Sequence, residues 1–230
     1  INMAKLLALR GWNVSVFGRP RQEGTYSGVV YKHFTGFNPR EPWDIFISWR
    51  MPSILTADLN AKKKYVWLHD CTPQEAFTED VLKNIDKIFV LSKFHRNLYP
   101  NIPDEKFLLT GNGINPEHFA NPGTRNPFYC INTSAPDRGL ETLLDMWPEI
   151  KEKVPQAELH WFYGWEVFDK LHEGNHTKME FKQRIQAKFA LTGAIEEERA
   201  DHLTIAKKYQ EAQLWLFPTE FTEIYCITAD

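Results

Sequence analysis

The sequence is poor in cysteine, long apolar runs and net charge, and each shortage argues against a class of protein. Its three cysteines, Cys71, Cys130 and Cys226, lie far apart in 230 residues. No C-x-x-C pair is present, which argues against a disulfide frame or zinc cage and favours a reducing compartment. No apolar stretch approaches the about 20 residues of a membrane-spanning helix. The formal net charge of −3 gives no general attraction to nucleic acid. We expect a cytoplasmic globular protein without a nucleic-acid partner.

The ends of the sequence suggest part of a longer chain. Residues 1–11 have the pattern of an amphipathic helix that ends at Gly11, with no capping residue ahead of it. The sequence stops at Asp230, within what resembles the first turns of another helix. We therefore expect a fragment that is incomplete at both termini. The only basic run, Lys62 to Lys64, is interpreted as a solvated helix end.

Short apolar runs recur along the chain, each followed by a polar turn and a helix-like or irregular stretch. They form two series: 14–17, 45–47, 65–68, 88–91 and 107–109, then 128–131, 159–163, 189–191 and 214–217. Such alternation indicates α/β structure with parallel sheets covered on both faces. The densest cluster of glycine, asparagine and proline separates the series. We predict two Rossmann-like domains, residues 1–118 and 119–230.

The segment Thr133 to Leu140 is the most informative local feature. It joins the expected strand 128–131 to a helix whose apolar positions, from Leu140 to Val154, follow one helical face. Arg138 and Gly139 thus lie at a helix N-terminus, where unsatisfied N–H groups and the helix dipole favour an anion. A purely structural turn is the alternative, since many such turns bind nothing.

Four motifs in order give a family resemblance. They are 86–92 followed by 112–115, Pro136 to Leu140, 155–164, and Leu216 to Glu223. The sequence resembles the retaining glycosyltransferases of family four, which have two facing Rossmann-like domains (the GT-B fold). The resemblance implies transfer of a sugar from a nucleotide-diphosphate donor to an acceptor hydroxyl, with retention of configuration and no metal or other cofactor. The family's first strand and its second acidic donor residue fall outside residues 1–230.

The resemblance also implies roles in the second domain. Arg138 would bind the donor phosphates, and Gly139 would let the backbone approach a phosphate. Glu223 would accept hydrogen bonds from the donor sugar at the start of a helix, with the amides of Ile224 and Tyr225 facing the diphosphate. The purely structural alternatives are a surface arginine, a tight turn and a glutamate that stabilises the dipole of its own helix. Glu220 competes with Glu223 for the donor role.

Three further residues complete the expected site. His69 would reach the donor sugar and help to orient the reacting carbon, although a histidine at a strand end is often structural. Asp70 is either an acceptor-side base or a helix cap. Gly193, after the expected strand 189–191, would lie beside the nucleobase. The acceptor is a carbohydrate, a lipid-linked molecule or a protein, so peripheral membrane contact stays open.

Three other functions compete with this hypothesis. His172, Glu173 and His176 match the H-E-x-x-H pattern of zinc proteases, but Gly174 and Asn175 weaken the helix which that chemistry needs. A nucleotide-sugar epimerase of the same fold would need positioned acid–base groups. A nucleotide-binding module that has lost catalysis would bind the donor nucleotide and turn nothing over.

Overall fold

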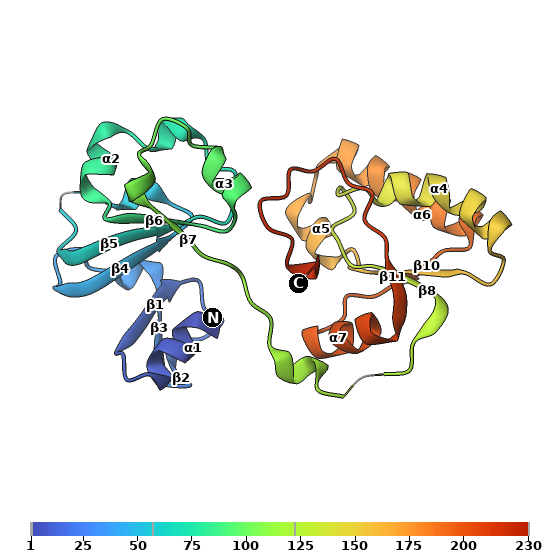
Figure 1. Cartoon of the computed structure of the whole chain (residues 1–230), viewed down its shortest axis with the longest axis horizontal. Coiled ribbons are helices and arrows are strands. Elements are labelled where there is room, and N and C mark those ends of the chain that lie inside the picture. Colours follow the sequence, from blue (N-terminus) through green and yellow to red (C-terminus); the bar gives the residue numbers. More distant parts are fainter. Residues whose placement is uncertain (1, 57, 122, 230) are drawn as a thin grey trace. The chain divides into compact units, whose positions relative to one another are not determined.

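The computed structural model describes residues 2–56, 58–121 and 123–229. The chain forms two compact units, Ile1–Asn112 and Gly113–Asp230 (Figure 1). Both contain parallel sheets and helices, so the expected α/β fold is confirmed. The assignment of an acceptor-side domain to residues 1–118 and a donor-side domain to residues 119–230 stays a prediction.

The larger sheet of the first unit is wholly parallel, in the order β4-β5-β6-β7. Its elements are β4 (Trp43–Trp49), β5 (Ala61–Trp67), α2 (Glu79–Asn84), β6 (Lys87–Val90), α3 (Lys93–Asn97) and β7 (Phe107–Leu109). Its core includes the fully buried side chains of Val66, Leu68 and Ile88. The lysine run lies inside β5, which corrects the expected helix end. Lys62 and Lys63 pair with carboxylates from neighbouring segments.

A smaller sheet precedes it, in the order β1-β3-β2. It follows α1 (Asn2–Leu9) and consists of β1 (Val14–Gly18), β2 (Gly24–Tyr26) and β3 (Val29–His33). The β2–β3 hairpin turns at Ser27 and Gly28, whose φ angles of 53° and 76° match the twist that a two-residue hairpin needs. The helix and β1 were expected, whereas the hairpin was not.

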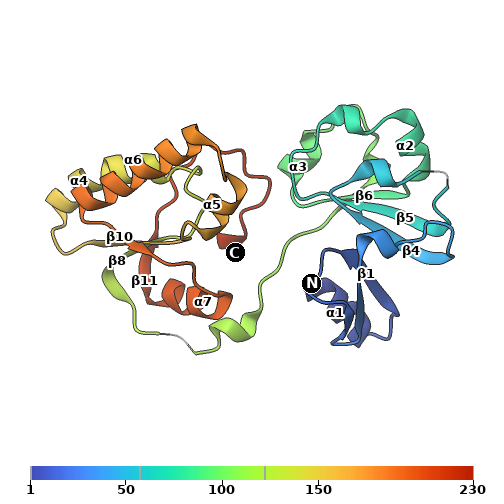
Figure 2. The same cartoon turned by 180° about the vertical axis from the view of Figure 1, so that it is seen from behind.

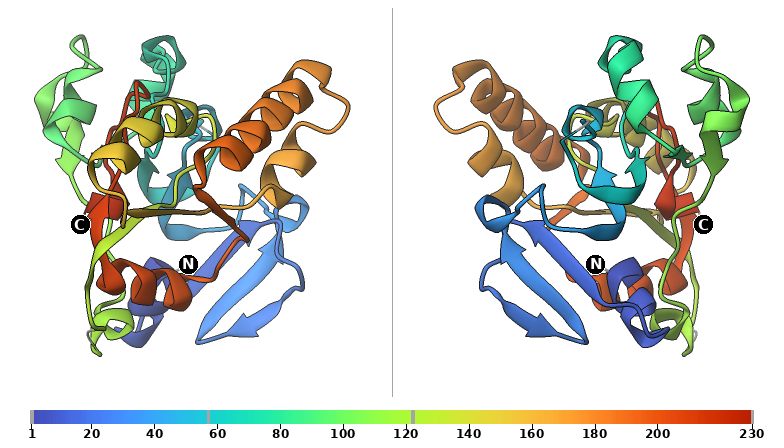
Figure 3. Two further views of the ribbon diagram at one scale, coloured as in Figure 1. Left: turned by 90° about the vertical axis from the view of Figure 1, so that its right-hand side faces the viewer. Right: turned by 90° about the vertical axis from the view of Figure 1, so that its left-hand side faces the viewer.

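The second unit has one parallel sheet, in the order β10-β9-β8-β11. Its elements are β8 (Asn126–Asn132), α4 (Leu140–Lys153), β9 (Glu158–Phe162), α5 (Glu166–Leu171), α6 (His176–Thr192), β10 (Ile195–Glu197), α7 (His202–Glu211) and β11 (Ala212–Trp215). Helices α4 and α6 pack together on one face of the sheet, and α7 covers the other (Figures 1 and 2). Figure 3 shows the same layers from the two ends.

The core beneath α4 and α6 explains why these segments are helical. Leu140, Leu143, Leu144 and Trp147 are at most 2% exposed and pack on the sheet, as the spacing predicts. The expected strand 189–191 is wrong, because these residues end α6. Within that helix Phe189 is buried one turn after Ile185, whereas Leu191 is 86% exposed. The periodicity is therefore helical.

One other predicted element differs from the structure. The helix expected from Ile224 is not formed, because residues 216–226 have no regular structure and a single 3-10 turn covers Ile227–Ala229. The cysteines are thiols. Within the described residues, no helix combines the length and apolar character needed to cross a membrane.

Candidate functional site

A buried asparagine joins two loops at the carboxyl edge of the second unit's sheet. Asn132, the last residue of β8, is fully buried. Its Nδ2 donates to the carbonyl of Leu216 at 2.7 Å, and its Oδ1 accepts from the N–H of Ser134 at 3.0 Å. The Nε1–H of Trp161 also donates to the carbonyl of Ser134, at 2.9 Å. The turn after β8 and the segment after β11 are thus fixed to each other and to β9.

Gly139 brings the same two segments into direct contact. Its φ of +85° is in the left-handed region, where residues with a Cβ are disfavoured. A Cβ at this position would lie 2.0 Å from the carbonyl oxygen of Pro218. The sequence suggested that this glycine makes room for a phosphate. In the structure the space beside its Cα is filled by Pro218, so the glycine is required by contact within the chain.

Arg138 and Glu223 meet at this edge. The Nη1 of Arg138 lies 3.1 Å from Oε1 of Glu223, and its guanidinium carbon lies 3.8 Å from the centroid of the Phe221 ring. The two charged side chains are 38% and 26% exposed, so both remain open to solvent. The guanidinium has five N–H donors, and the carboxylate engages only part of that fork.

The strength of this pair bears on what it can do. A half-exposed ion pair is worth at most about 1 kcal/mol, whereas hydrogen bonds to charged groups reach about 1.5–3 kcal/mol. A phosphate that binds Arg138 bidentately can therefore displace the carboxylate of Glu223 from the guanidinium, or share the guanidinium with it, without disrupting the fold. The first turn of α4 begins at Leu140, and no side chain caps it at Gly139. Its N–H groups favour the same anion.

A second arginine lies at this edge, and no sequence pattern predicted it. Arg199 follows β10, and its guanidinium carbon lies 4.9 Å from the centroid of the Tyr163 ring, in the loop after β9. Gly164, with a φ of +67°, allows the close approach, because a Cβ there would lie 2.8 Å from the backbone nitrogen of Arg199. The short strand β10 reads Ile-Glu-Glu, so neither it nor Arg199 could be placed from apolar periodicity.

The remaining predicted residues of this unit are placed differently. Glu220 is exposed, and Glu223 is the acid beside Arg138. Ile224 and Tyr225 follow Glu223 in irregular backbone and not in a helix. Gly193 caps the C-terminus of α6 and precedes β10, so it lies at the amino end of that strand, away from the edge that holds Arg138. The structure does not bring Gly193 together with the other predicted donor residues.

The first unit contains the other predicted residues, His69 and Asp70, just after β5. The ring of His69 packs on Trp49 and Trp67, with centroid distances of 5.9 Å and 4.8 Å. Its Nε2 is buried and has no hydrogen-bond partner among the described residues. Burial, and then the positive charge of Arg50, lower the pKa of His69. A neutral imidazole with an unsatisfied nitrogen is suited to hydrogen-bond a ligand.

Asp70 is not a helix cap, because Thr78 caps the next helix, α2. Its Oδ2 instead lies 2.8 Å from Nη1 of Arg50. Arg50 has a φ of 71°, which is unusual for a residue with a Cβ, and its guanidinium lies 4.5 Å from the centroid of the Trp49 ring. Trp49 is 61% exposed.

His95 provides a structural contrast to His69. It is fully buried, its Nδ1 accepts from the N–H of Leu91 at 3.2 Å, and its Nε2 donates to the carbonyl of Asp70 at 3.2 Å. Burial lowers the pKa of His95, which agrees with the neutral ring that this bonding requires. Both ring nitrogens are satisfied, so His95 supports the loop at Asp70 and His69 is the histidine available for chemistry.

The H-E-x-x-H segment does not form the helix that a zinc protease uses. His172 follows the end of α5, Gly174 has a φ of +76°, and His176 begins α6. Among the described residues, no group of three His, Cys, Asp or Glu side chains is arranged to hold a metal ion. The two histidines thus lie at the facing ends of two successive helices, and the segment between them is a connecting turn.

Comparisons with known proteins identify the fold. No protein-family model and no curated protein sequence matches the chain. A glycosyltransferase from Rickettsia africae ESF-5 matches with a TM-score of 0.68 at 13% identity, over 98% of this chain and 69% of its own. The pneumococcal O-GlcNAc transferase GtfA, solved with UDP and GlcNAc, matches with a TM-score of 0.53 at 13% identity, over 74% of this chain and 35% of its own.

TarM matches with a TM-score of 0.51 at 16% identity, over 76% of this chain and 36% of its own. At such identities the likeness shows the fold, which is that of the GT-B glycosyltransferases. This chain spans about a third of the length of TarM and of GtfA.

Proposed function

We propose that this chain carries the donor site of a glycosyltransferase that uses a nucleotide-diphosphate sugar. The observation that carries the proposal is the meeting of Arg138 and Glu223 at 3.1 Å, although 85 residues separate them in sequence. A cation beside a carboxylate suits a ligand that is anionic at its phosphates and rich in hydroxyls at its sugar. Both groups lie at the carboxyl edge of a parallel sheet, where α/β proteins bind their ligands.

The chemistry follows from the roles of these groups. Cleavage of the bond between sugar and phosphate leaves negative charge on the diphosphate. Arg138 and the first-turn amides of α4 stabilise that charge, and Glu223 holds sugar hydroxyls. In this proposal no metal takes part, and the anomeric configuration is retained, as in family four. His69 and Asp70 serve as substrate contacts of the first unit, which receives the acceptor.

Calorimetric titration of the chain with UDP, GDP and ADP tests the donor site. UDP is the first choice, since GtfA was solved with UDP. We expect Arg138→Ala to weaken nucleotide binding by about 1–3 kcal/mol. Arg125→Ala, which removes an exposed arginine ahead of β8, is the matched control and should change nothing. Equal losses in both variants, or none in Arg138→Ala, would contradict the assignment. Chelator in the buffer tests the metal requirement.

Activity is tested with UDP-GlcNAc, with and without a panel of carbohydrate and lipid-linked acceptors. Acceptor-dependent release of UDP supports a transferase, and the proton coupling at the new anomeric centre decides between retention and inversion. A new sugar nucleotide in the absence of acceptor indicates an epimerase. Binding without any turnover indicates a nucleotide-binding module.

A further inference from the structure

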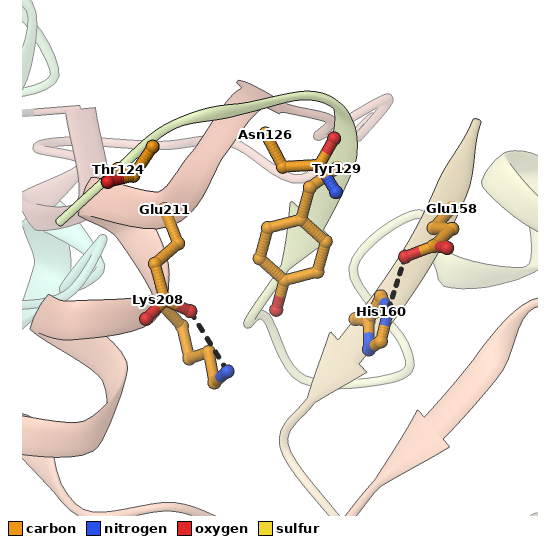
Figure 4. Close-up of a pocket in the computed structure, with 7 residues that line it drawn as sticks. All are labelled: Thr124, Asn126, Tyr129, Glu158, His160, Lys208 and Glu211. Atoms are coloured by element: carbon orange, nitrogen blue, oxygen red, sulfur yellow. Dashed lines mark hydrogen bonds and ion pairs between the residues drawn. The ribbon is translucent and has the colours of Figure 1, made fainter. Parts of the chain in front are cut away.

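A pocket lies in the second unit, at the amino ends of β8 and β9. Its volume is about 260 Å³, far more than the roughly 30 Å³ that one water occupies in the liquid. It is lined by Thr124, Asn126, Tyr129, Glu158, His160, Lys208 and Glu211 (Figure 4). None of these residues belongs to the carboxyl edge that holds Arg138 and Glu223. The pocket is therefore separate from the proposed donor site.

Tyr129 supplies the first sign of a ligand. The residue is only 6% exposed, and its hydroxyl has no hydrogen-bond partner among the described residues. Figure 4 shows that hydroxyl directed between Lys208 on one side and His160 on the other. Burial of a hydroxyl without a partner is costly, so buried hydroxyls in proteins are nearly always satisfied.

His160 supplies a second, independent sign. Its Nδ1 lies 2.8 Å from Oε1 of Glu197, so Nδ1 carries the proton and donates it to the carboxylate. In the neutral ring Nε2 is then an acceptor. This Nε2 is buried and, among the described residues, has no hydrogen bond. The nearest carboxylate oxygen, of Glu158, lies at 3.7 Å, which is too long for one.

The charges around the pocket favour a cation. Two carboxylates, from Glu158 and Glu211, line it, and Lys208 is the single cation in its lining. A third carboxylate, of Glu197, pairs with His160 behind the lining. Lys208 Nζ lies 3.0 Å from Oε2 of Glu211, so its charge is already balanced. Burial raises the pKa of Tyr129, and the charges of the same three glutamates raise it further. The hydroxyl thus lies in a negative field.

We propose that this pocket binds a small primary amine in its protonated form. The ammonium group donates to Oη of Tyr129 and Nε2 of His160, and the carboxylate of Glu158 balances its charge. An ammonium has three donors and no acceptor, which matches a pocket with an excess of acceptors. An anion meets carboxylates here, and a neutral polyol leaves them uncompensated. The chemical class of the ligand is therefore that of short amines and amino alcohols.

The probe is ethanolamine, with ethane-1,2-diol as an uncharged molecule of similar size and sodium chloride as the ionic-strength control. Each is titrated into the 15N-labelled chain and followed by amide chemical shifts. We expect saturable changes that centre on Tyr129, His160 and Glu211 with ethanolamine alone. Equal changes with the diol or with salt, or no saturable change, would show that only water occupies the pocket and would overturn the proposal.

Two substitutions in the pocket test where ethanolamine binds. Tyr129→Phe should weaken ethanolamine binding about tenfold, because it removes one hydrogen-bond partner of a charged group. Glu158→Gln should weaken it about threefold to fivefold, because the Glu158 side chain is half-exposed. Glu149→Gln, an exposed acid on α4 that pairs with Lys153, is the matched control. Retention of full affinity in Glu158→Gln would overturn the site. Both pocket variants should fold, because the Glu158 side chain is 53% exposed and Tyr129→Phe removes one oxygen.

Discussion

The two edges of the second unit's sheet differ in charge, although the same strands build both. At the carboxyl edge, Arg138 and Arg199 lie in loops that follow strands, and helix α4 begins there. At the amino edge, the polar residues come from the strands themselves and from the end of α7, and carboxylates outnumber cations. This contrast has a physical origin. The βα loops present unsatisfied N–H groups that favour anions, whereas the polar side chains of the opposite edge present acceptors that favour cations.

The largest expected effect tests what holds the carboxyl edge together. Gly139→Ala places a Cβ against the carbonyl of Pro218 at a positive φ, and should lower the free energy of unfolding by about 2–5 kcal/mol. Gly174→Ala is the matched control, because its φ is also positive but nothing lies within 4 Å of the added carbon. Urea denaturation measures both. Similar losses would mean that backbone conformation alone, and not the Pro218 contact, requires a glycine.

Removal of the charge of Glu223 should affect the binding of the nucleotide and of the nucleotide sugar in opposite directions. Glu223→Gln leaves Arg138 without its carboxylate, so UDP should bind as well or up to about 1 kcal/mol more tightly. A UDP-sugar should bind about 1 kcal/mol less tightly, because its hydroxyls lose a charged acceptor. Calorimetry with UDP and UDP-GlcNAc checks both signs. A parallel change for the two ligands would contradict a sugar contact by Glu223.

The first turn of α4 makes stability depend on pH. The hydrogen bond from Arg184 holds the pKa of Glu141 at about 2, opposed by burial and assisted by Lys188. Since the folded pKa is below the usual 4.5, this stabilisation is complete above about pH 4.5 and is lost as the pH falls towards 2. The Glu141 side chain is 32% exposed, so solvent reduces the contribution to about 1 kcal/mol.

The Glu141→Gln variant measures that contribution. The free energy of unfolding of the unaltered chain should fall more steeply between about pH 5 and pH 3 than that of the variant. Glu149→Gln, which removes a mostly exposed pair on the same helix, should leave the pH dependence unchanged. Identical slopes for all three chains would show that the Glu141 cluster does not stabilise the fold.

The smallest effect concerns the amino edge. Without ligand, Tyr129→Phe should leave the free energy of unfolding unchanged or raise it by up to about 1 kcal/mol, because the lost hydroxyl has no partner among the described residues. Thermal unfolding measures this, with Tyr209→Phe as the comparison. The hydroxyl of Tyr209 lies 2.5 Å from Oγ1 of Thr133, so its removal should destabilise. Destabilisation by Tyr129→Phe would reveal a structural role for its hydroxyl.

Apolar periodicity predicts the strands and helices of this molecule that bury one apolar face. The strand at 128–131 and the helix from Leu140 are confirmed, because burial of one face determines their periodicity. Strand β10 escaped prediction because its acids have partners remote in sequence: Glu196 accepts from Nε1 of Trp165, and Glu197 from His160. Such long-range partners make a glutamate tolerable where an apolar residue is expected.

The same distinction applies to the site. Arg138 could be chosen from a local turn, but its contact with Glu223 joins distant segments and was reachable only through the family resemblance. The contact between Gly139 and Pro218 was not predicted, because Pro218 lies far along the chain. Tyr129 and His160 could not be distinguished from core residues, since an orphaned hydroxyl or ring nitrogen is a property of three-dimensional packing.

The hydrogen bonds of the Asn132 side chain affect how fast a ligand can bind and how much conformational entropy is lost on binding. Its amide joins a carbonyl 84 residues away to the start of the loop that carries Arg138. Because those bonds exist before any ligand arrives, the loops surrender little conformational entropy on binding. A preorganised receptor of this kind should associate in a single kinetic step, without a slow closing phase. One buried amide thereby helps to determine how fast the proposed donor site fills.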